Sequence, residues 1–375
     1  MGISTGSGIT DAQLSATGNN FTGVRLALAS AVIWTHCYWL VTGTAAADEI
    51  AAVIGMPISA LAVNGFFFLS GFLICQSLFR QPGLLSFAAM RIARIWPAMA
   101  VSSLLTLLAF ALLSGRFVDY IVDLRSIEFL GRNLTLLRAE YALPDLSRGE
   151  ETLVVNGSLW TIPWEMRCYA AMALGFAFTA DRRPAAVRPV LIASIVAAAL
   201  WTVAQELRSD FPSTAAGLLF NIDVAMRLWG CFAAGALVWL ERRRAMPPLW
   251  LAVVALLCAV AEYELFGTAL LASPAFFLLV MVVAFGGGPA RAVTARWADF
   301  SYGIYIYAFP VMIVIATLWP ALTSDHRLLA AANFGMVLPI AVLSWYGVEK
   351  PALDRARRWL RQRRARQMPT LTAEE

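Results

Sequence analysis

The sequence predicts an all-α integral membrane protein with about ten transmembrane helices, on three observations. Of its 375 residues, 60% are hydrophobic and only 14% are charged, whereas about 25% of the residues in soluble domains are charged. Apolar runs of about 18 residues or more recur along the whole chain, and such runs are long enough to cross a membrane. Basic residues concentrate in alternate connections between the runs, which is typical of polytopic proteins.

The apolar runs place the helices, and the basic residues orient them. We expect helices at about 21–42, 58–79, 97–114, 158–180, 189–206, 216–240, 248–266, 269–287, 299–319 and 328–346. Ten spans put both termini on one side of the membrane. The loops after the second, fourth, sixth and eighth helices, together with the tail, hold 19 Lys and Arg residues, against seven in the opposite loops. The positive-inside rule therefore predicts that both termini are cytoplasmic.

The polar segments indicate one membrane domain with short extensions. We divide the chain into a polar N-terminal segment (1–20), a transmembrane domain (21–350) and a basic cytoplasmic tail (351–375). Residues 115–157 form the longest outside segment and are either a partly ordered lid over a site or a connector. The basic tail either binds anionic headgroups or a partner, or is a solvated anchor.

Composition also limits the class of ligand. The net charge of +5 follows membrane topology rather than one surface patch, so no nucleic-acid partner is expected. The five cysteines fall in or beside apolar runs and have no C-x-x-C spacing. Neither a metal site nor a disulfide framework is therefore indicated.

Two ionisable residues in the first span, Arg25 and His36, are candidates for a functional site, because charge within a span is costly. They are eleven residues apart, which returns to nearly the same helix face about 16 Å further along the axis. An imidazole can take a proton from a hydroxyl near neutral pH, and a guanidinium can hold a phosphate with two hydrogen bonds. A buried histidine is more often a packing residue, so both interpretations stay open for His36.

Two neighbouring stretches carry further candidates. The run NGFFFLSGFLI contains Gly65, Ser70 and Gly71, which permit the close approach of a ligand or, more commonly, of another helix. Arg91 and Arg94 are one helical turn apart. They either follow the positive-inside rule or form a one-sided phosphate clamp.

The fourth span carries a buried acid. Glu165 follows Pro163 by two residues, and a proline bends a span and frees a backbone carbonyl group. Glu165 would orient or charge-balance His36, or pair with Arg167.

Two further polar features have simpler explanations. Asp223 and Arg227 are four residues apart on one span and can pair with each other. His326, in a short outer loop, is interpreted as a surface histidine.

Together these stretches resemble the acyltransferase-3 family of bacterial membrane O-acyltransferases, which modify lipopolysaccharide O-antigen, exopolysaccharide, Nod factor and similar carbohydrates. The resemblance follows six motifs in the family's order. These are R-x10-H from Arg25 to His36, FFxLSGFLI ending at Ile74, R-x-x-R at Arg91 and Arg94, LWTxPWE from Leu159 to Glu165, SYGxYxYxFP from Ser301 to Pro310, and VEKP from Val348 to Pro351.

The resemblance implies an enzyme of the bacterial inner (plasma) membrane. It would transfer an acyl group, acetyl by family default, from cytoplasmic acyl-coenzyme A to a hydroxyl of an extracytoplasmic carbohydrate or glycolipid. His36 is then expected to be catalytic, as a general base or as a transient acyl carrier, together with Glu165. The residues expected to hold the coenzyme A phosphates are Arg25, Arg91 and Arg94. The residues that either line the site or merely pack are Ser70, Trp164, Ser301 and Tyr302.

The chain departs from many relatives in two ways. Many have a histidine where this chain has Ala308, and some continue into a soluble hydrolase-like domain, so we expect transfer to finish within the membrane domain. The alternative from another class is a transporter or flippase with a buried Arg, His and Glu path; a transporter is expected to show internal repeats, and none is evident. No motif indicates the acceptor, the acyl chain length or the oligomeric state.

Overall fold

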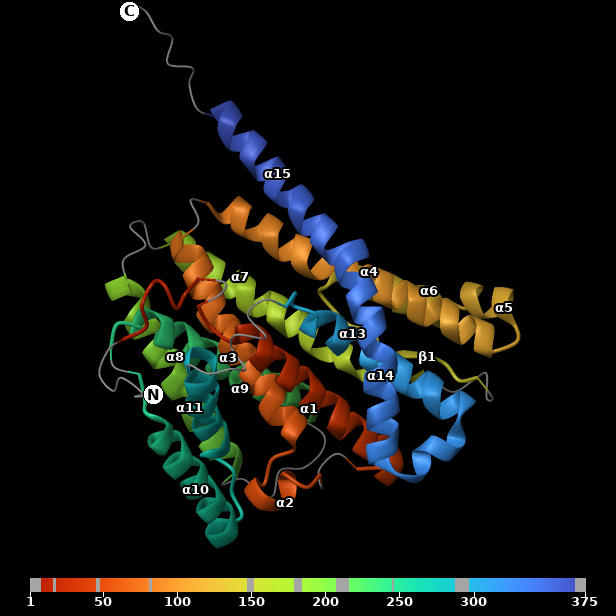
Figure 1. Ribbon diagram of the computed structural model, residues 1–375, viewed down its shortest axis with the longest axis horizontal. Coiled ribbons are helices and arrows are strands. Elements are labelled where there is room, and N and C mark those ends of the chain that lie inside the picture. Colours follow the sequence, from red (N-terminus) through yellow and green to blue (C-terminus); the bar gives the residue numbers. More distant parts are fainter. Residues whose placement is uncertain are drawn as a thin grey trace, which may run out of the picture.

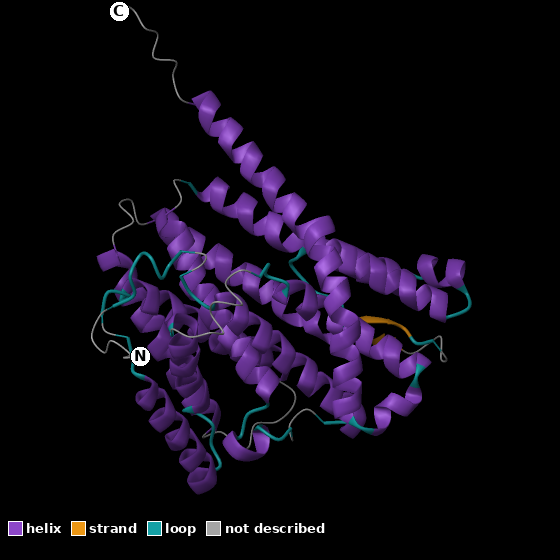
Figure 2. Ribbon diagram, in the orientation of Figure 1, coloured by secondary structure: helices purple, strands orange, loops and turns teal. Residues whose placement is uncertain are grey.

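The computed structural model describes residues 8–15, 18–44, 48–80, 83–146, 152–178, 184–206, 216–244, 246–286 and 297–367. Within these residues the chain is almost entirely helical, with one two-stranded hairpin (Figure 2). The helices pack side by side in a bundle, with α10 and α11 at one edge and α5 and α6 at the opposite edge (Figure 1).

Ten long helices correspond one to one with the ten expected from the sequence. They are α1 (Phe21–Thr42), α3 (Ile58–Arg80), α4 (Leu84–Leu113), α7 (Ile162–Phe178), α8 (Pro184–Glu206), α9 (Ala216–Leu240), α10 (Leu249–Phe266), α11 (Ala272–Phe285), α13 (Ser301–Leu318) and α14 (His326–Ser344). Eight helices in the described part of the chain are long and apolar enough to cross a membrane. Helices α7 and α11, with 17 and 14 residues, are shorter. The chain is a polytopic membrane protein, and the side on which its termini lie stays a prediction.

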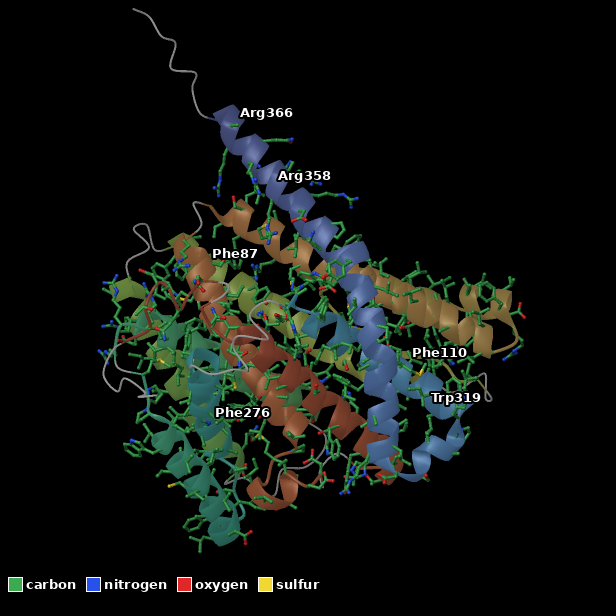
Figure 3. The ribbon with its side chains drawn as sticks, in the orientation of Figure 1. Phe87, Phe110, Phe276, Trp319, Arg358 and Arg366 are labelled. Atoms are coloured by element: carbon green, nitrogen blue, oxygen red, sulfur yellow. The ribbon has the colours of Figure 1, made fainter. Side chains whose placement is uncertain are left out.

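Helix α14 continues through a π-helical turn, η4 (Trp345–Glu349), into α15 (Lys350–Gln367). Helix α15 projects from the bundle, and its side chains Arg358 and Arg366 point away from it (Figure 3).

The expected start of the third span was wrong. We placed it at 97, but α4 begins at Leu84 and contains Pro97. Pro97 removes only the hydrogen bond to the carbonyl group of Ala93, and the helix continues past it. Arg91 and Arg94 consequently lie on a regular helix, which holds them on one face.

Helices α3 and α9 approach each other through glycines. A Cβ atom on Gly71 would lie 1.8 Å from the carbonyl oxygen of Phe232, and one on Gly235 would lie 1.8 Å from that of Phe68. Backbones come this close only where small residues meet. Of the two explanations for Gly71, helix packing is therefore the one seen, while the adjacent Ser70 faces a cavity.

A proline in α13 anchors two other elements. Pro310 has no N–H group to donate to the carbonyl group of Ile306. That carbonyl accepts instead from Asn156 Nδ2 at 2.9 Å and from Ser102 Oγ at 3.2 Å. The middle of α13 is thereby bonded to α4 and to the chain that leads into the 3-10 helix η1 (Gly157–Thr161).

The segment 115–157 forms an ordered connector in the residues described. It contains α5 (Phe117–Val122), α6 (Leu124–Thr135) and the antiparallel strands β1 (Ala142–Pro144) and β2 (Thr152–Val154). The Trp96 indole of α4 donates to the carbonyl group of Leu134 at 2.9 Å. Among the residues of this segment that the structure describes, none lines the cavity described below, which favours the connector interpretation over a lid. The short elements α2 (Ala51–Ile54) and η3 (Pro320–Ser324) complete the fold.

Candidate functional site

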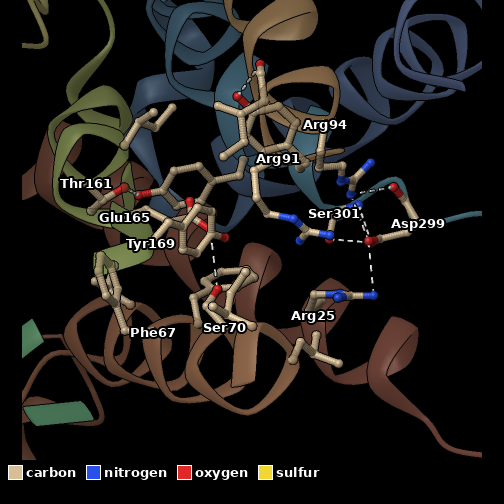
Figure 4. A pocket seen from close by; sticks show the side chains of 18 residues that line it. Arg25, Phe67, Ser70, Arg91, Arg94, Thr161, Glu165, Tyr169, Asp299 and Ser301 are labelled. Atoms are coloured by element: carbon tan, nitrogen blue, oxygen red, sulfur yellow. Dashed lines mark hydrogen bonds and ion pairs between the residues drawn. The ribbon is translucent and has the colours of Figure 1, made fainter. Parts of the chain in front are cut away.

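A cavity of about 130 Å³ lies among α1, α3, α4, α7 and α13 (Figure 4). Three arginines and two carboxylates line it: Arg25, Arg91, Arg94, Glu165 and Asp299. Six hydroxyl groups also line it: those of Ser70, Thr161, Tyr169, Ser301, Tyr302 and Tyr305. The fold thus brings together seven of the nine side chains expected at the site. The two exceptions are His36 and Trp164.

Arg94 is held between two carboxylates. Its Nη1 atom lies 2.7 Å from Oε2 of Glu349, and its Nη2 atom lies 2.8 Å from Oδ2 of Asp299. Arg25 contacts the same Oδ2 atom at 3.1 Å. Figure 4 shows the two arginines meeting at Asp299 from different elements. One carboxylate therefore links the first helix of the chain to α4.

The charge of Asp299 is set by these neighbours. Burial alone would raise the pKa of Asp299, but Arg25 and Arg94, with a hydrogen bond from Ser301 Oγ at 2.5 Å, lower it below its ordinary value. Asp299 is consequently ionised at neutral pH.

Sequence reasoning missed both carboxylates. Glu349 belongs to the VEKP stretch and is 0% exposed, but it is about 255 residues from Arg94 in sequence. The available signal was a glutamate at the junction of an apolar span and a basic tail. A glutamate side chain buried at such a place needs a positively charged partner. Its π-helical turn is a further sign, because such turns occur frequently at functional sites.

Glu165 has hydroxyl partners. Its Oε1 atom accepts hydrogen bonds from Ser70 Oγ at 3.3 Å and from the Tyr169 hydroxyl. Arg167 does not pair with it, contrary to one expectation: its guanidinium lies over the Trp164 ring, 4.4 Å from the centroid, and donates to the carbonyl group of Leu137. Trp164 accordingly packs beneath Arg167 and does not line the cavity.

His36 lies beyond the end of the cavity. Its ring packs edge-on against Phe309, with the centroids 4.9 Å apart. Phe309 is one helical turn further along α13 than Tyr305, the last cavity-lining residue of that helix. The Tyr305 hydroxyl hydrogen-bonds Thr161 Oγ1 at 2.8 Å. Tyr305 is therefore the cavity-lining residue of α13 closest in sequence to the contact between Phe309 and His36.

Several buried polar atoms near Phe309 have no hydrogen-bond partner among the described residues. They are Nδ1 of His36, Oδ1 of Asn156 and Oγ of Ser158. Gly157 lies between the last two, and a Cβ atom there would be 2.8 Å from Cε2 of the Phe309 ring. The His36 ring and the start of η1 thus contact the same phenylalanine. Since buried polar atoms are nearly always satisfied, this is a place where a substrate group or water is expected.

Two expectations outside the cavity are revised. Arg227 donates to Oδ1 of Asn64 at 3.1 Å, and no ion pair to Asp223 is found among the described residues. His326 is not a plain surface histidine, because its side chain is only 15% exposed and lies 3.2 Å from Glu49. The Trp34 ring of α1 packs edge-on against it.

Comparison with known proteins is consistent with this geometry. A family model described as an acyltransferase domain, Acyl_transf_3, matches residues 19–347. The chain is 27% identical to an "O-acetyl transferase" of Shigella phage Sf6 over 352 residues, which is 90% of this chain and 97% of the relative. It is 26% identical to "Nodulation protein 10" of Rhizobium leguminosarum bv. viciae over 360 residues, 89% of this chain and 93% of the relative. No solved structure shows a significant match.

Proposed function

Because the chain belongs to the acyltransferase-3 family, we propose that it transfers an acyl group from acyl-coenzyme A to a hydroxyl of a carbohydrate or glycolipid outside the cytoplasm. The coarser statement, that it is a membrane O-acyltransferase, follows from the family match and from the named O-acetyl transferase relative. That relative makes acetyl the first acyl group to test.

The observation that carries the proposal is the arginine-lined cavity. Three guanidinium groups converge on it from α1 and α4, and guanidinium groups are the preferred partners of phosphate oxygens. Coenzyme A presents phosphates at one end and a thioester at the other, so a polyanion site at the arginines would orient the thioester away from them.

The first helix supplies a distance that fits such a donor. Arg25 and His36 lie on α1, and eleven residues of helix span about 16 Å. The pantetheine arm of coenzyme A is of comparable length. Along α13, Phe309 follows the cavity-lining Tyr305 by one helical turn and contacts His36, so the thioester would pass the Phe309 ring to reach the imidazole.

We assign the proton transfer to His36. Its imidazole takes the proton of the acceptor hydroxyl as the oxygen attacks the thioester carbonyl. The C–S bond breaks, the ester C–O bond forms, and the thiolate leaves with the proton from the imidazolium. If the imidazole instead attacks first, it carries the acyl group to the acceptor; both routes require the same histidine.

Glu165 acts at the other end of the path. It lines the same cavity as Arg91 and accepts from Ser70 and Tyr169, so we assign it to balancing the charge of Arg91 and fixing the two hydroxyl groups. Orientation of His36, which the sequence also suggested, is not supported by these contacts.

The test is binding and acceptor-free turnover by the purified full-length protein. Calorimetry with coenzyme A is expected to show binding by the wild type and by His36→Ala, and weakened binding by Arg25→Ala. The wild type is also expected to release thiol slowly from acetyl-coenzyme A by transfer to water, and His36→Ala is expected not to. A wild-type protein that binds no coenzyme A would contradict the proposal at its first step.

A further inference from the structure

The three arginines of the cavity have different surroundings, and we infer that they have different tasks. Arg91 is the arginine that contacts the phosphates of the donor. Arg94 is a positioning residue that holds the site together and contacts no donor. This inference rests on the proposed function and divides the roles within it.

The guanidinium group of Arg94 is already occupied. Its two terminal nitrogens donate hydrogen bonds to Glu349 and Asp299, and Nη2 also lies 3.5 Å from the backbone carbonyl oxygen of Asp299. Aromatic rings contact the group as well: its central carbon lies 5.6 Å from the centroid of Tyr302 and 5.2 Å from that of Trp345. An incoming phosphate would have to displace a carboxylate to reach it.

Arg91 presents the opposite situation one turn earlier on α4. Its Nε atom is buried without a hydrogen-bond partner, and no carboxylate forms an ion pair with it among the residues that the structure describes. The Phe87 ring lies 5.9 Å from its central carbon, and the Glu165 carboxylate and the Tyr169 hydroxyl act on its charge without forming an ion pair with it. A buried guanidinium that forms no ion pair is costly, so Arg91, with Glu165 acting on it only without direct pairing, is the arginine with most to gain from a phosphate.

Arg25 is intermediate. One terminal nitrogen contacts Asp299 at 3.1 Å, while its Nε atom is buried and unpartnered. It shares Asp299 with Arg94 and keeps donors free. We therefore expect it to assist Arg91 in binding the donor.

The location of Glu349 makes Arg94 necessary for folding. Glu349 is 0% exposed and lies at the junction of α14 and α15. Removing Arg94 alone leaves this carboxylate buried without a counter-charge, which is strongly destabilising. A loss of function in Arg94→Ala would consequently say nothing about phosphate binding. The informative variant removes both charges of the pair.

The experiment compares Arg91→Gln with the double variant Arg94→Gln/Glu349→Gln in the full-length protein. Coenzyme A affinity is measured by calorimetry and stability by thermal melting. Arg91→Gln is expected to keep the wild-type melting temperature and to lose about tenfold or more in affinity, the value of a charge-assisted hydrogen bond. The double variant is expected to melt above Arg94→Gln and to bind within about threefold of wild type, as for a residue outside the contact.

A matched control is Arg80→Gln, which removes a positive charge from the end of α3, outside the cavity. Arg80→Gln is expected to change neither the coenzyme A affinity nor the melting temperature. Because the double variant can fail to fold, a conservative pair gives a second reading: Arg91→Lys is expected to weaken binding at constant melting temperature, and Arg94→Lys to lower the melting temperature at constant affinity.

The possible failures are distinguishable. If the wild type binds coenzyme A and the double variant loses as much affinity as Arg91→Gln, or if the two lysine variants show the reverse pattern, the division of roles is wrong and the proposed function survives. If the wild type binds no coenzyme A, both are wrong.

Discussion

The two ends of the path along α1 differ in how their polar groups are satisfied. At the Arg25 end, the charges of Arg94, Asp299 and Glu349 are paired at 2.7–2.8 Å with no ligand present. At the other end, His36, Asn156 and Ser158 each keep a buried polar atom without a partner. The difference teaches that the cluster of Arg94, Asp299 and Glu349 is preorganised by the protein itself. The His36 end, like the Nε atoms of Arg25 and Arg91, instead has buried polar atoms that a substrate would satisfy.

This contrast separates stability from activity. Where groups are paired, removal of one leaves its partner buried and unsatisfied, so the cost falls on folding. Where a group has no partner, its removal leaves nothing behind, and the cost falls on the reaction. Variants at each end can therefore be tested by measuring whether the stability or the reaction rate changes.

The largest effect is expected for His36→Gln. A positioned acid–base residue contributes about 10²–10⁴-fold to a rate, so thiol release from acetyl-coenzyme A is expected to fall by that factor. The melting temperature is expected to stay within error, because no partner of the Nδ1 atom is lost. A variant that melts much earlier, or that keeps its turnover, would show that His36 is a packing residue.

A smaller effect on turnover is expected for Gly157→Ala. The new Cβ atom would lie 2.8 Å from Cε2 of Phe309, so the ring against His36 must shift. A displacement of about 1 Å near reacting groups can cost about 10²-fold in rate, and a loss of up to that size is expected with coenzyme A affinity unchanged. The control is Gly175→Ala on α7, where a Cβ atom meets nothing within 4 Å; equal losses in both would remove the link between Phe309 and the reaction.

Asp299→Asn is expected to act on stability. The substitution removes the charge that Arg25 and Arg94 share, and hydrogen bonds to charged groups contribute about 1.5–3 kcal/mol each. Because the folded-state pKa of Asp299 is lowered, its contribution is present above the unfolded-state pKa of about 3.9 and is lost as pH falls through the folded-state value.

The measurement for Asp299 is thermal melting of wild type and variant at several pH values. The difference between the two melting temperatures is expected to have its largest value at pH 6–8 and to become smaller at pH below about 4. A difference that grows on acidification would mean that the carboxyl group is protonated in the folded protein.

The smallest effect is expected for Arg80→Gln. Arg80 lies 3.4 Å from Asp11, and the two side chains are 49% and 84% exposed. Exposed pairs of this kind contribute about 0–1 kcal/mol, so melting temperature, affinity and turnover should all match wild type. A marked loss of affinity would extend the donor site beyond the cavity.

The sequence predicted the helices well because their cause is local. An apolar run long enough to cross a membrane is readable residue by residue, and nine of the ten expected spans begin within about five residues of the observed helix. The exception is α4, which begins at Leu84, 13 residues before the expected start, and contains Pro97; a long apolar helix can contain a proline if neighbouring groups compensate.

The site was predicted in part for the same reason. Arg25, Arg91, Arg94 and Glu165 were identified because a charge in an apolar run is conspicuous, and all four line the cavity. Asp299 and Glu349 lie at the ends of runs, where a charge is ordinary. Nothing local distinguishes a solvated carboxylate there from one paired with Arg94.

By itself, then, the sequence determined that this is a polytopic membrane protein of one family, with its helices and its charged candidates in place. Only the tertiary structure decided which arginine is paired, that Glu165 bonds Ser70 and Tyr169, and that His36 packs against Phe309, outside the cavity. The physical reason is that helix formation depends on neighbours in sequence, whereas the pairing of buried charges depends on which helices meet. Here the decisive contact joins residues about 255 positions apart.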